Sequence, residues 1–221
     1  MEMKGATDVM CDNSSQKDLE HEVMPNVYLL ERTDQITELH TILMDKQTSH
    51  SEFVFYADRL IRLLVEEALN RLPYKEIEVQ TPANVRYKGI AFCRGNCGVS
   101  ICRSGEAMER ALRQCCRSVR IGKMVIGDNA KLLYARLMTD IMNRRVLLLH
   151  PLLSAGVAVN KAISVLKDNG VPVKNILLLC LFATPSGIKQ VMSQHSEVSI
   201  LTSDINTLVP FWFTTKYFGT D

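Results

Sequence analysis

Apolar positions follow two different periods along the chain, and the change between them predicts the fold. From Glu52 to Leu72 the large apolar residues recur at near-helical spacing and Pro73 ends the run, which predicts a helix with a charged outer face. Beyond Pro73, short Leu-, Ile- and Val-rich runs alternate with helical patterns. Strands are predicted at Cys97–Cys102, Lys123–Ile126, Leu132–Met138, Val146–Leu149, Ile176–Phe182 and Val198–Thr202, and helices at Gly105–Cys116, Val157–Lys167 and Ser186–Gln194. Because continuous apolar strands are buried on both faces, we predict an α/β fold with a central, mostly parallel sheet flanked by helices.

Composition separates the first 24 residues from the rest. Residues 1–24 are polar and show little apolar periodicity, so we expect a mobile leader followed by one folded domain at 25–221. The chain has 26 Lys and Arg against 24 Asp and Glu, a net charge of +2, which provides no global field for nucleic acid or an anionic membrane. The longest apolar stretch, near Val146–Val159, is interrupted by His150, Pro151 and Ser154 and is too short to span a bilayer. We therefore expect neither a nucleic-acid nor a membrane partner.

The cysteines bear on the compartment and on metal binding. The chain has seven cysteines and no C-x-x-C pair, which predicts a reduced chain in the cytoplasm, with the nucleus as a second compartment. Their spacings also miss those of zinc sites. We expect buried free thiols rather than metal ligands.

A candidate anion site follows the strand at Val146–Leu149. A short loop leads from this strand into a helix that begins near Val157, and the unpaired N–H groups of a helix's first turn attract anions. The loop comprises His150, Pro151, Leu152, Leu153, Ser154, Ala155, Gly156, Val157 and Ala158. A plain strand-to-helix connection is the alternative interpretation.

A second strand ends at a residue that suits phosphate binding. Arg103 lies where the strand Cys97–Cys102 ends and the next helix is about to begin. Ligands of parallel sheets bind at the carboxyl ends of the strands, and a guanidinium can clamp a phosphate there. Arg103 could equally be a surface ion-pair partner.

Several separated motifs agree with one family. They are Tyr56–Arg62, Arg103–Gly105, Val119–Lys123, the loop at His150–Ala158, and the tail Tyr217–Thr220. In this order and at these spacings the chain resembles the uracil phosphoribosyltransferase family from about Glu31 to its last residue. The resemblance implies a type I phosphoribosyltransferase fold and pyrimidine salvage, in which ribose 5-phosphate passes from phosphoribosyl diphosphate to uracil, giving UMP and diphosphate. It also implies Mg²⁺ with the donor, a homo-oligomer, diphosphate contact by Arg103, and ribose-phosphate contact by the His150–Ala158 loop.

The loop departs from the family's pattern, which usually begins Asp-Pro-Met and continues to Ala-Thr. His150 stands at the position of the Asp that holds the ribose hydroxyls, and an imidazole offers at most one acceptor where a carboxylate offers several. Ala155 replaces the Thr whose hydroxyl contacts the phosphate, although Ser154 lies beside it. Gly156 and the helix start are kept. We expect phosphate binding to persist in a looser form and ribose recognition to weaken.

The uracil end departs further. The resemblance places uracil recognition at Phe211, Trp212, Phe213 and Thr215, but no glycine lies between Gly187 and Gly219, whereas the family has a Pro-Gly-x-Gly stretch there. Thr215 replaces an acid. The three aromatic residues are either a stacking platform for another base or ordinary packing residues. The mobile loop before the phosphate loop is also shortened, to residues 127–131.

Basic residues within the matching motifs point to an effector. In some eukaryotic relatives, elements that match those carrying Arg59, Arg120 and Arg144 border an allosteric GTP site at a subunit contact. Solvated helix and strand ends are the alternative for these arginines.

Three functions follow from these patterns. The first is a homologue that retains a phosphoribosyl diphosphate or nucleotide site with weak or no catalysis. The second is an active uracil phosphoribosyltransferase. The third is a structural or regulatory subunit without a ligand, and the altered loop favours the first.

Overall fold

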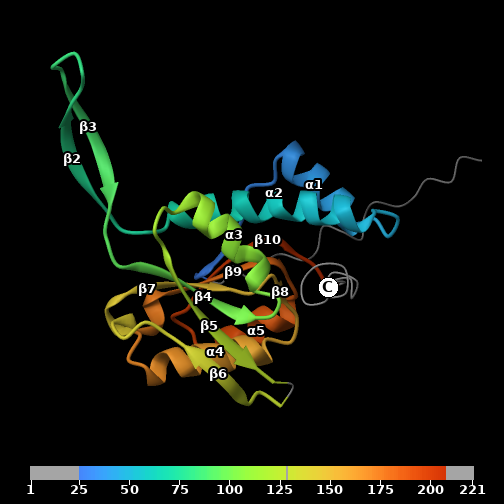
Figure 1. Cartoon of the computed structure of the whole chain (residues 1–221). Helices are drawn as coiled ribbons and strands as arrows, with labels where there is room; N and C mark the ends of the chain where they lie inside the picture. Colours follow the sequence, from blue (N-terminus) through green and yellow to red (C-terminus); the bar gives the residue numbers. More distant parts are fainter. Residues whose placement is uncertain (1–24, 128, 208–221) are drawn as a thin grey trace, which may run out of the picture.

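A computed structural model describes residues 25–127 and 129–207 of the chain (Figure 1). These residues form an eight-stranded sheet that is parallel except for β6 at one edge. The strand order is β1 (Val27–Leu29), β10 (Ser199–Ile205), β9 (Ile176–Ala183), β7 (Arg145–Leu149), β4 (Asn96–Cys102), β5 (Arg120–Ile126) and β6 (Leu132–Arg136), with β8 (Leu152–Leu153) pairing beside β9. The predicted α/β class and all six predicted strands are confirmed. The predicted leader lies outside the described residues.

Helices cover both faces of the sheet (Figure 1). On one face lie α1 (Asp34–Met44), α2 (His50–Leu69) and α3 (Glu106–Cys115), and on the other lie α4 (Val157–Asp168) and α5 (Pro185–Gln194). Two short 3₁₀ turns, Ile141–Asn143 and Val173–Asn175, precede β7 and β9. The three helices predicted beyond Pro73 are confirmed within a few residues at their ends.

The two-faced burial of the central strands explains this layering. Every residue of β9 is buried. Successive strand residues point to opposite faces, so Leu177 and Leu179 join the core under α1, α2 and α3, whereas Leu178 and Cys180 join the core against α4 and α5. An unbroken Leu-rich run is thus what a sheet covered on both sides requires.

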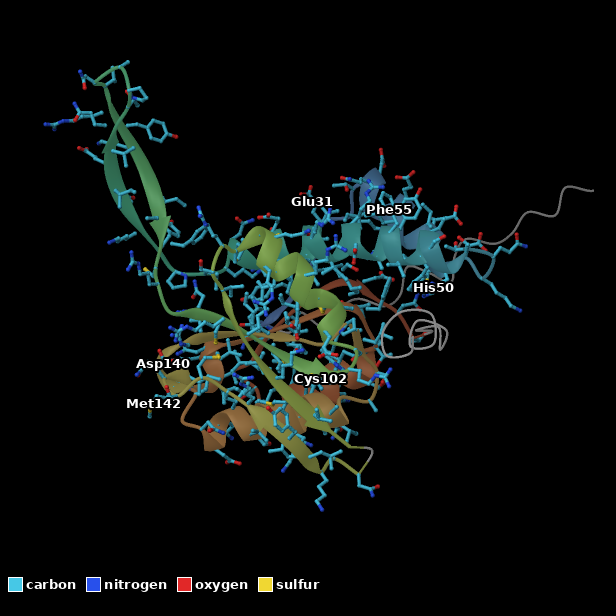
Figure 2. The ribbon with its side chains drawn as sticks, viewed as in Figure 1. Glu31, His50, Phe55, Cys102, Asp140 and Met142 are labelled. Carbon is cyan, nitrogen blue, oxygen red and sulfur yellow. The ribbon has the colours of Figure 1, made fainter. Side chains whose placement is uncertain are left out.

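Helix α2 confirms the first prediction of the pattern. Its start is fixed by a capping box in which the Ser49 hydroxyl accepts from the Glu52 amide and the Glu52 carboxylate accepts from the Ser49 amide. Phe53 is fully buried, whereas Phe55, two residues on, is 60% exposed and points outward in Figure 2. The apolar stripe therefore faces the sheet, and the rest of the helix surface faces solvent.

Some elements were not predicted from the sequence. They include β1, α1 and a hairpin of β2 (Tyr74–Gln80) and β3 (Arg86–Phe92), which extends away from the body of the molecule (Figure 1). The hairpin strands are exposed along most of their length, so they lack the apolar run by which the other strands were found. Among the described residues, no helix is long and apolar enough to cross a membrane.

Candidate functional site

The carboxyl ends of β4, β7 and β9 bring three turns of the chain together. The turn after β4 carries Arg103 and Ser104, the loop after β7 begins at His150, and the turn after β9 carries Thr184. Direct contacts join them: Ser104 Oγ lies 3.3 Å from His150 Nδ1, and the Thr184 amide donates to the Leu153 carbonyl at 2.8 Å. The structure therefore gathers Arg103 and the predicted phosphate loop at one edge of the sheet.

The predicted loop has the backbone form of an anion cradle. Gly156 takes a left-handed conformation with φ of 74° immediately before α4, where a residue with a Cβ would be strained. Among the residues that the structure describes, no side-chain hydrogen bond caps α4 at its N-cap, Gly156. Its early N–H groups are therefore open to a ligand, and the helix dipole favours an anion there.

The turn after β9 anchors this loop by a hydrogen bond and by close packing. The Thr184 hydroxyl donates to the Ser154 carbonyl at 2.6 Å and also accepts from the Gly187 amide at 2.9 Å. A Cβ built on Gly187 would come within 2.1 Å of the same Ser154 oxygen. The chain packs so closely here that only glycine fits. The side chains of Ser154 and Ala155 remain exposed on the outer side of the loop.

Glycine also allows the turn after β4 to meet the end of β7. A Cβ on Gly105 would approach the Leu149 carbonyl oxygen to 2.4 Å and two backbone atoms of Ile101 to 2.8 Å. The peptide bond between Cys102 and Arg103 is cis. Arg103 itself is exposed and makes no ion pair with the part of the chain that the structure describes. Its guanidinium is thus available to a phosphate group.

The imidazole of His150 is neutral at physiological pH. Burial lowers its pKa from 6.5 to about 4, because the charged form loses its hydration. Its Nδ1 pairs with the Ser104 hydroxyl, so only Nε2 is left for a ligand. This nitrogen donates or accepts depending on the tautomer. A single neutral hydrogen bond is therefore what His150 can offer.

An ion-pair network borders the turn that carries Arg103. Lys123 on β5 pairs with Glu106 and, at 3.4 Å, with Glu109, both on α3, and the Ser100 hydroxyl donates to Glu109 at 2.6 Å. The hydrogen bond to Glu106 raises the pKa of Lys123. Ser104 and Lys123 belong to motifs that were found in the sequence, but neither was predicted to be a site residue. The network engages the carboxylates of both Glu106 and Glu109.

These groups do not form a magnesium site of the protein's own. Mg²⁺ prefers oxygen ligands, often one or two carboxylates together with the phosphates of a substrate. His150 is a neutral nitrogen base, and Glu106 and Glu109 are held by Lys123. Within residues 25–127 and 129–207, no group of three or more His, Cys, Asp and Glu could hold a metal ion. The Mg²⁺ that the resemblance implies would have to arrive with the donor's own oxygens.

The arginines predicted to bind GTP lie elsewhere. Arg120 begins β5 and Arg144 precedes β7, so both lie at the amino-terminal edge of the parallel strands. Arg144 is bonded to Asp140 through Nε at 2.9 Å and Nη2 at 2.6 Å, which lowers the pKa of Asp140. Figure 2 shows Asp140 well away from Cys102, the last residue of β4. Arg59 lies on α2, with its guanidinium 5.6 Å from the ring centre of Tyr56. GTP binding stays a prediction.

The residues predicted to contact uracil cannot be placed. Phe211, Trp212, Phe213 and Thr215 lie outside the described residues. Strand β10 ends at Ile205, at the same edge of the sheet as the phosphate loop. The geometry therefore supports a phosphate-binding half of the site and leaves the base-binding half as a prediction.

Solved structures share this fold. A protein from Aquifex aeolicus, AQ2163, superposes with a TM-score of 0.70 at 20% identity over 81% of this chain and 87% of its own. An adenine phosphoribosyl transferase from Trypanosoma brucei, solved with AMP, pyrophosphate and ribose-5-phosphate, gives a TM-score of 0.58 at 11% identity over 86% and 87% of the two chains. At these identities the likeness concerns the fold alone, and it confirms the predicted phosphoribosyltransferase architecture.

Sequence relatives are much closer. A "Uracil phosphoribosyltransferase homolog" of Danio rerio is 47% identical over 96% of this chain and 87% of its own length. The human protein of the same name is 49% identical over 97% of this chain and 72% of its own length. The family model described as uracil phosphoribosyltransferase matches residues 30–209, which is most of the sequence. The chain therefore belongs to the uracil phosphoribosyltransferase family.

Proposed function

We propose that the protein is a homologue of uracil phosphoribosyltransferase that still binds phosphoribosyl diphosphate or a nucleotide but transfers its ribose phosphate to uracil weakly or not at all. The observation that carries this proposal is His150. A neutral imidazole, bonded to Ser104, stands where the family's loop usually has an aspartate.

Four features support continued phosphate binding. No side chain of the described residues caps α4 at its start, Gly156 provides the left-handed turn before it, and Thr184 holds the Ser154 carbonyl by a hydrogen bond. Arg103 is exposed and free to pair with a second phosphate group. Backbone N–H groups and one guanidinium are sufficient for an anion site.

The side chains support weak transfer. Glycosyl transfer passes through a state in which positive charge develops on the sugar ring. A carboxylate in the loop would oppose that charge and accept hydrogen bonds from the ribose hydroxyls, whereas neutral His150 adds no charge and at most one acceptor. The protein can therefore keep its affinity for the donor while it stabilises the transition state less.

The missing hydroxyl at Ala155 weakens the cradle further. A hydrogen bond to a charged group contributes about 1.5–3 kcal/mol, so its loss weakens phosphate binding by roughly tenfold or more. Ala155 is exposed on the loop, where a threonine hydroxyl could reach a phosphate without repacking the core. Ser154, also exposed, can replace part of this contact.

The test is conversion of labelled uracil to UMP with phosphoribosyl diphosphate and Mg²⁺, in the wild type and in a His150→Asp/Ala155→Thr variant. We expect wild-type turnover far below the order of 1 per second that is usual for enzymes, and a gain in the variant. The matched control is His150→Asn/Ala155→Thr, which restores the hydroxyl without the charge and should gain less. Wild-type turnover at the usual rate would instead favour the active enzyme. Failure of donor binding in every variant would favour the structural subunit.

Self-association is the second part of the proposal. A two-stranded hairpin is at best marginally stable alone in water, yet β2 and β3 expose Tyr74, Val79, Tyr87, Ile90 and Phe92. A homo-oligomer that covers this hairpin accounts for these side chains. Light scattering should give a mass above 24.9 kDa for the wild type and a lower mass for a Val79→Glu/Tyr87→Glu variant. A wild-type monomer would remove this part.

Two finer points complete the proposal. The six described cysteines are all free, which supports a reducing compartment, the cytoplasm or the nucleus. GTP is proposed as an effector that contacts Arg59, Arg120 and Arg144, of which Arg120 and Arg144 share one edge of the sheet. Calorimetry that gives no heat with GTP, alone or with phosphoribosyl diphosphate, would remove the effector.

A further inference from the structure

A cavity of about 390 Å³ opens at the amino-terminal ends of β7, β9 and β10, on the opposite edge of the sheet from the phosphate loop. Polar residues from five separate segments line it, among them Tyr28, Arg71, Arg145, Lys174, Asn175 and Ser199. Its floor is apolar, formed by the first residues of the strands, such as Val146 and Ile176. A cavity of this size and mixed lining is within the range of small-molecule sites.

The charged side chains that line the cavity among the described residues are all positive. Three cations meet at the cavity, and no carboxylate from the described residues lines it. Arg71 is partly compensated by Glu67, with which it pairs at 3.0 Å. Arg145 and Lys174 are exposed and make no ion pair with the part of the chain that the structure describes. Because the whole chain carries a net charge of only +2, this is a local positive site.

One wall of the cavity is fixed in place. The Arg71 guanidinium carbon lies 3.8 Å from the centre of the Tyr28 ring, and Glu67 holds the same guanidinium from the side. Stacking and ion pairing together restrain a side chain that would otherwise be flexible. The anionic group of a ligand would therefore contact Arg145 and Lys174, and the Arg71 guanidinium would add to the positive electrostatic potential.

The cavity is separate from the other sites described. Strand β7 runs from Arg145 at the cavity to Leu149 at the phosphate loop, a separation of roughly 13 Å along the strand. Of the arginines predicted to bind GTP, Arg120 begins β5, which lies on the other side of β7 from β9 and β10, whereas Arg59 lies on α2 and Arg144 is bonded to Asp140. None of the three lines the cavity. No residue of the phosphate loop lines the cavity.

We infer that this cavity binds a small organic phosphate, a phosphomonoester or a diphosphate, with its anionic group between Arg145 and Lys174. Arg supplies paired donors in a fork that matches phosphate, and Lys supplies a point charge. Asn175, Ser199 and the Tyr28 hydroxyl offer neutral hydrogen bonds to the rest of the molecule. The inference does not depend on the proposed function, because it concerns the opposite edge of the sheet.

The experiment is a titration of the full chain with ribose 5-phosphate, followed by amide shifts in NMR spectra. We expect one set of shifts at Asn175 and Ser199, and a separate set at Gly156. In an Arg145→Ala/Lys174→Ala variant the first set should require at least about tenfold more ligand, since each charged contact is worth about one factor of ten. The Gly156 set should not change.

Two controls make the outcome specific. Lys189→Ala removes an exposed cation from α5 and should leave both sets of shifts unchanged. Arg103→Ala should weaken only the set at Gly156. Unchanged affinity at Asn175 and Ser199 in the Arg145→Ala/Lys174→Ala variant would overturn the inference. The inference would also be overturned if the only effect of the Arg145→Ala/Lys174→Ala variant were a change in oligomeric mass, because the cavity would then belong to a contact between subunits. Loss of the Gly156 set alone would count against the proposed function and not against the cavity.

Discussion

Replacing Gly187 with alanine tests whether the phosphate loop is held by its contact with the turn after β9. The new Cβ would lie 2.1 Å from the Ser154 carbonyl oxygen and 3.0 Å from that of Leu153, and contacts below 3.0 Å essentially do not occur. The loop must therefore move by about 1 Å, since overpacked atoms cannot be compressed. Overpacking costs about 1–3 kcal/mol, and loss of the hydrogen bond from Thr184 to Ser154 adds about 1 kcal/mol.

The assay is urea denaturation, followed by titration with phosphoribosyl diphosphate and Mg²⁺. We expect Gly187→Ala to lower the free energy of unfolding by about 2–4 kcal/mol and to weaken donor binding, because the displaced Ser154 carries the cradle with it. The matched control is Lys189→Ala, an exposed position two residues on in the same helix, which should change stability by less than about 0.5 kcal/mol. If Gly187→Ala matched this control in both measurements, the loop would not be held as described.

Three further predictions concern stability. As the pH falls from 6.5 towards 4, the unfolded chain binds a proton at His150 that the folded protein excludes, so up to about 3 kcal/mol of stability should be lost. A His150→Asn variant should therefore show a flatter pH dependence of its urea midpoint than the wild type. Equal slopes for the two proteins would refute burial of the imidazole. Phe53→Ala should cost about 3–5 kcal/mol and Phe55→Ala less than about 0.5 kcal/mol, and equal losses would contradict the orientation of α2. Ser49→Ala should cost about 1 kcal/mol in thermal unfolding through the lost cap, whereas Ser49→Asp, which can still cap, should cost less.

The sheet could be predicted because its strands are buried on both faces. A short, continuous apolar run such as Ile176–Phe182 is typical of a strand that is buried on both faces. The observed strand differs from the predicted one by one residue. The β2–β3 hairpin could not be found in this way, since most of its residues face solvent and only an alternating, weakly apolar pattern remains. Its stability depends on contacts that the local sequence does not encode.

The sequence showed which turns contribute to the site, but it did not show which of their residues contact one another. His150 and Arg103 were identified by their places after strands, but the pairing of His150 with Ser104 joins residues 46 positions apart and depends on β7 lying next to β4. The same holds for the neutral state of His150, because its lowered pKa comes from burial by the folded chain. The role of Gly187 likewise follows from packing against Ser154 and has no local signature.

The central claim is that the phosphate cradle is retained while transfer is impaired. Calorimetric titration of the wild type with phosphoribosyl diphosphate and Mg²⁺, with Arg103→Ala as the comparison, tests the retained part most directly. We predict saturable binding to the wild type that weakens by at least about tenfold in Arg103→Ala, since a charged contact to the diphosphate is lost. Absence of binding to the wild type, or equal binding to both proteins, would contradict the claim.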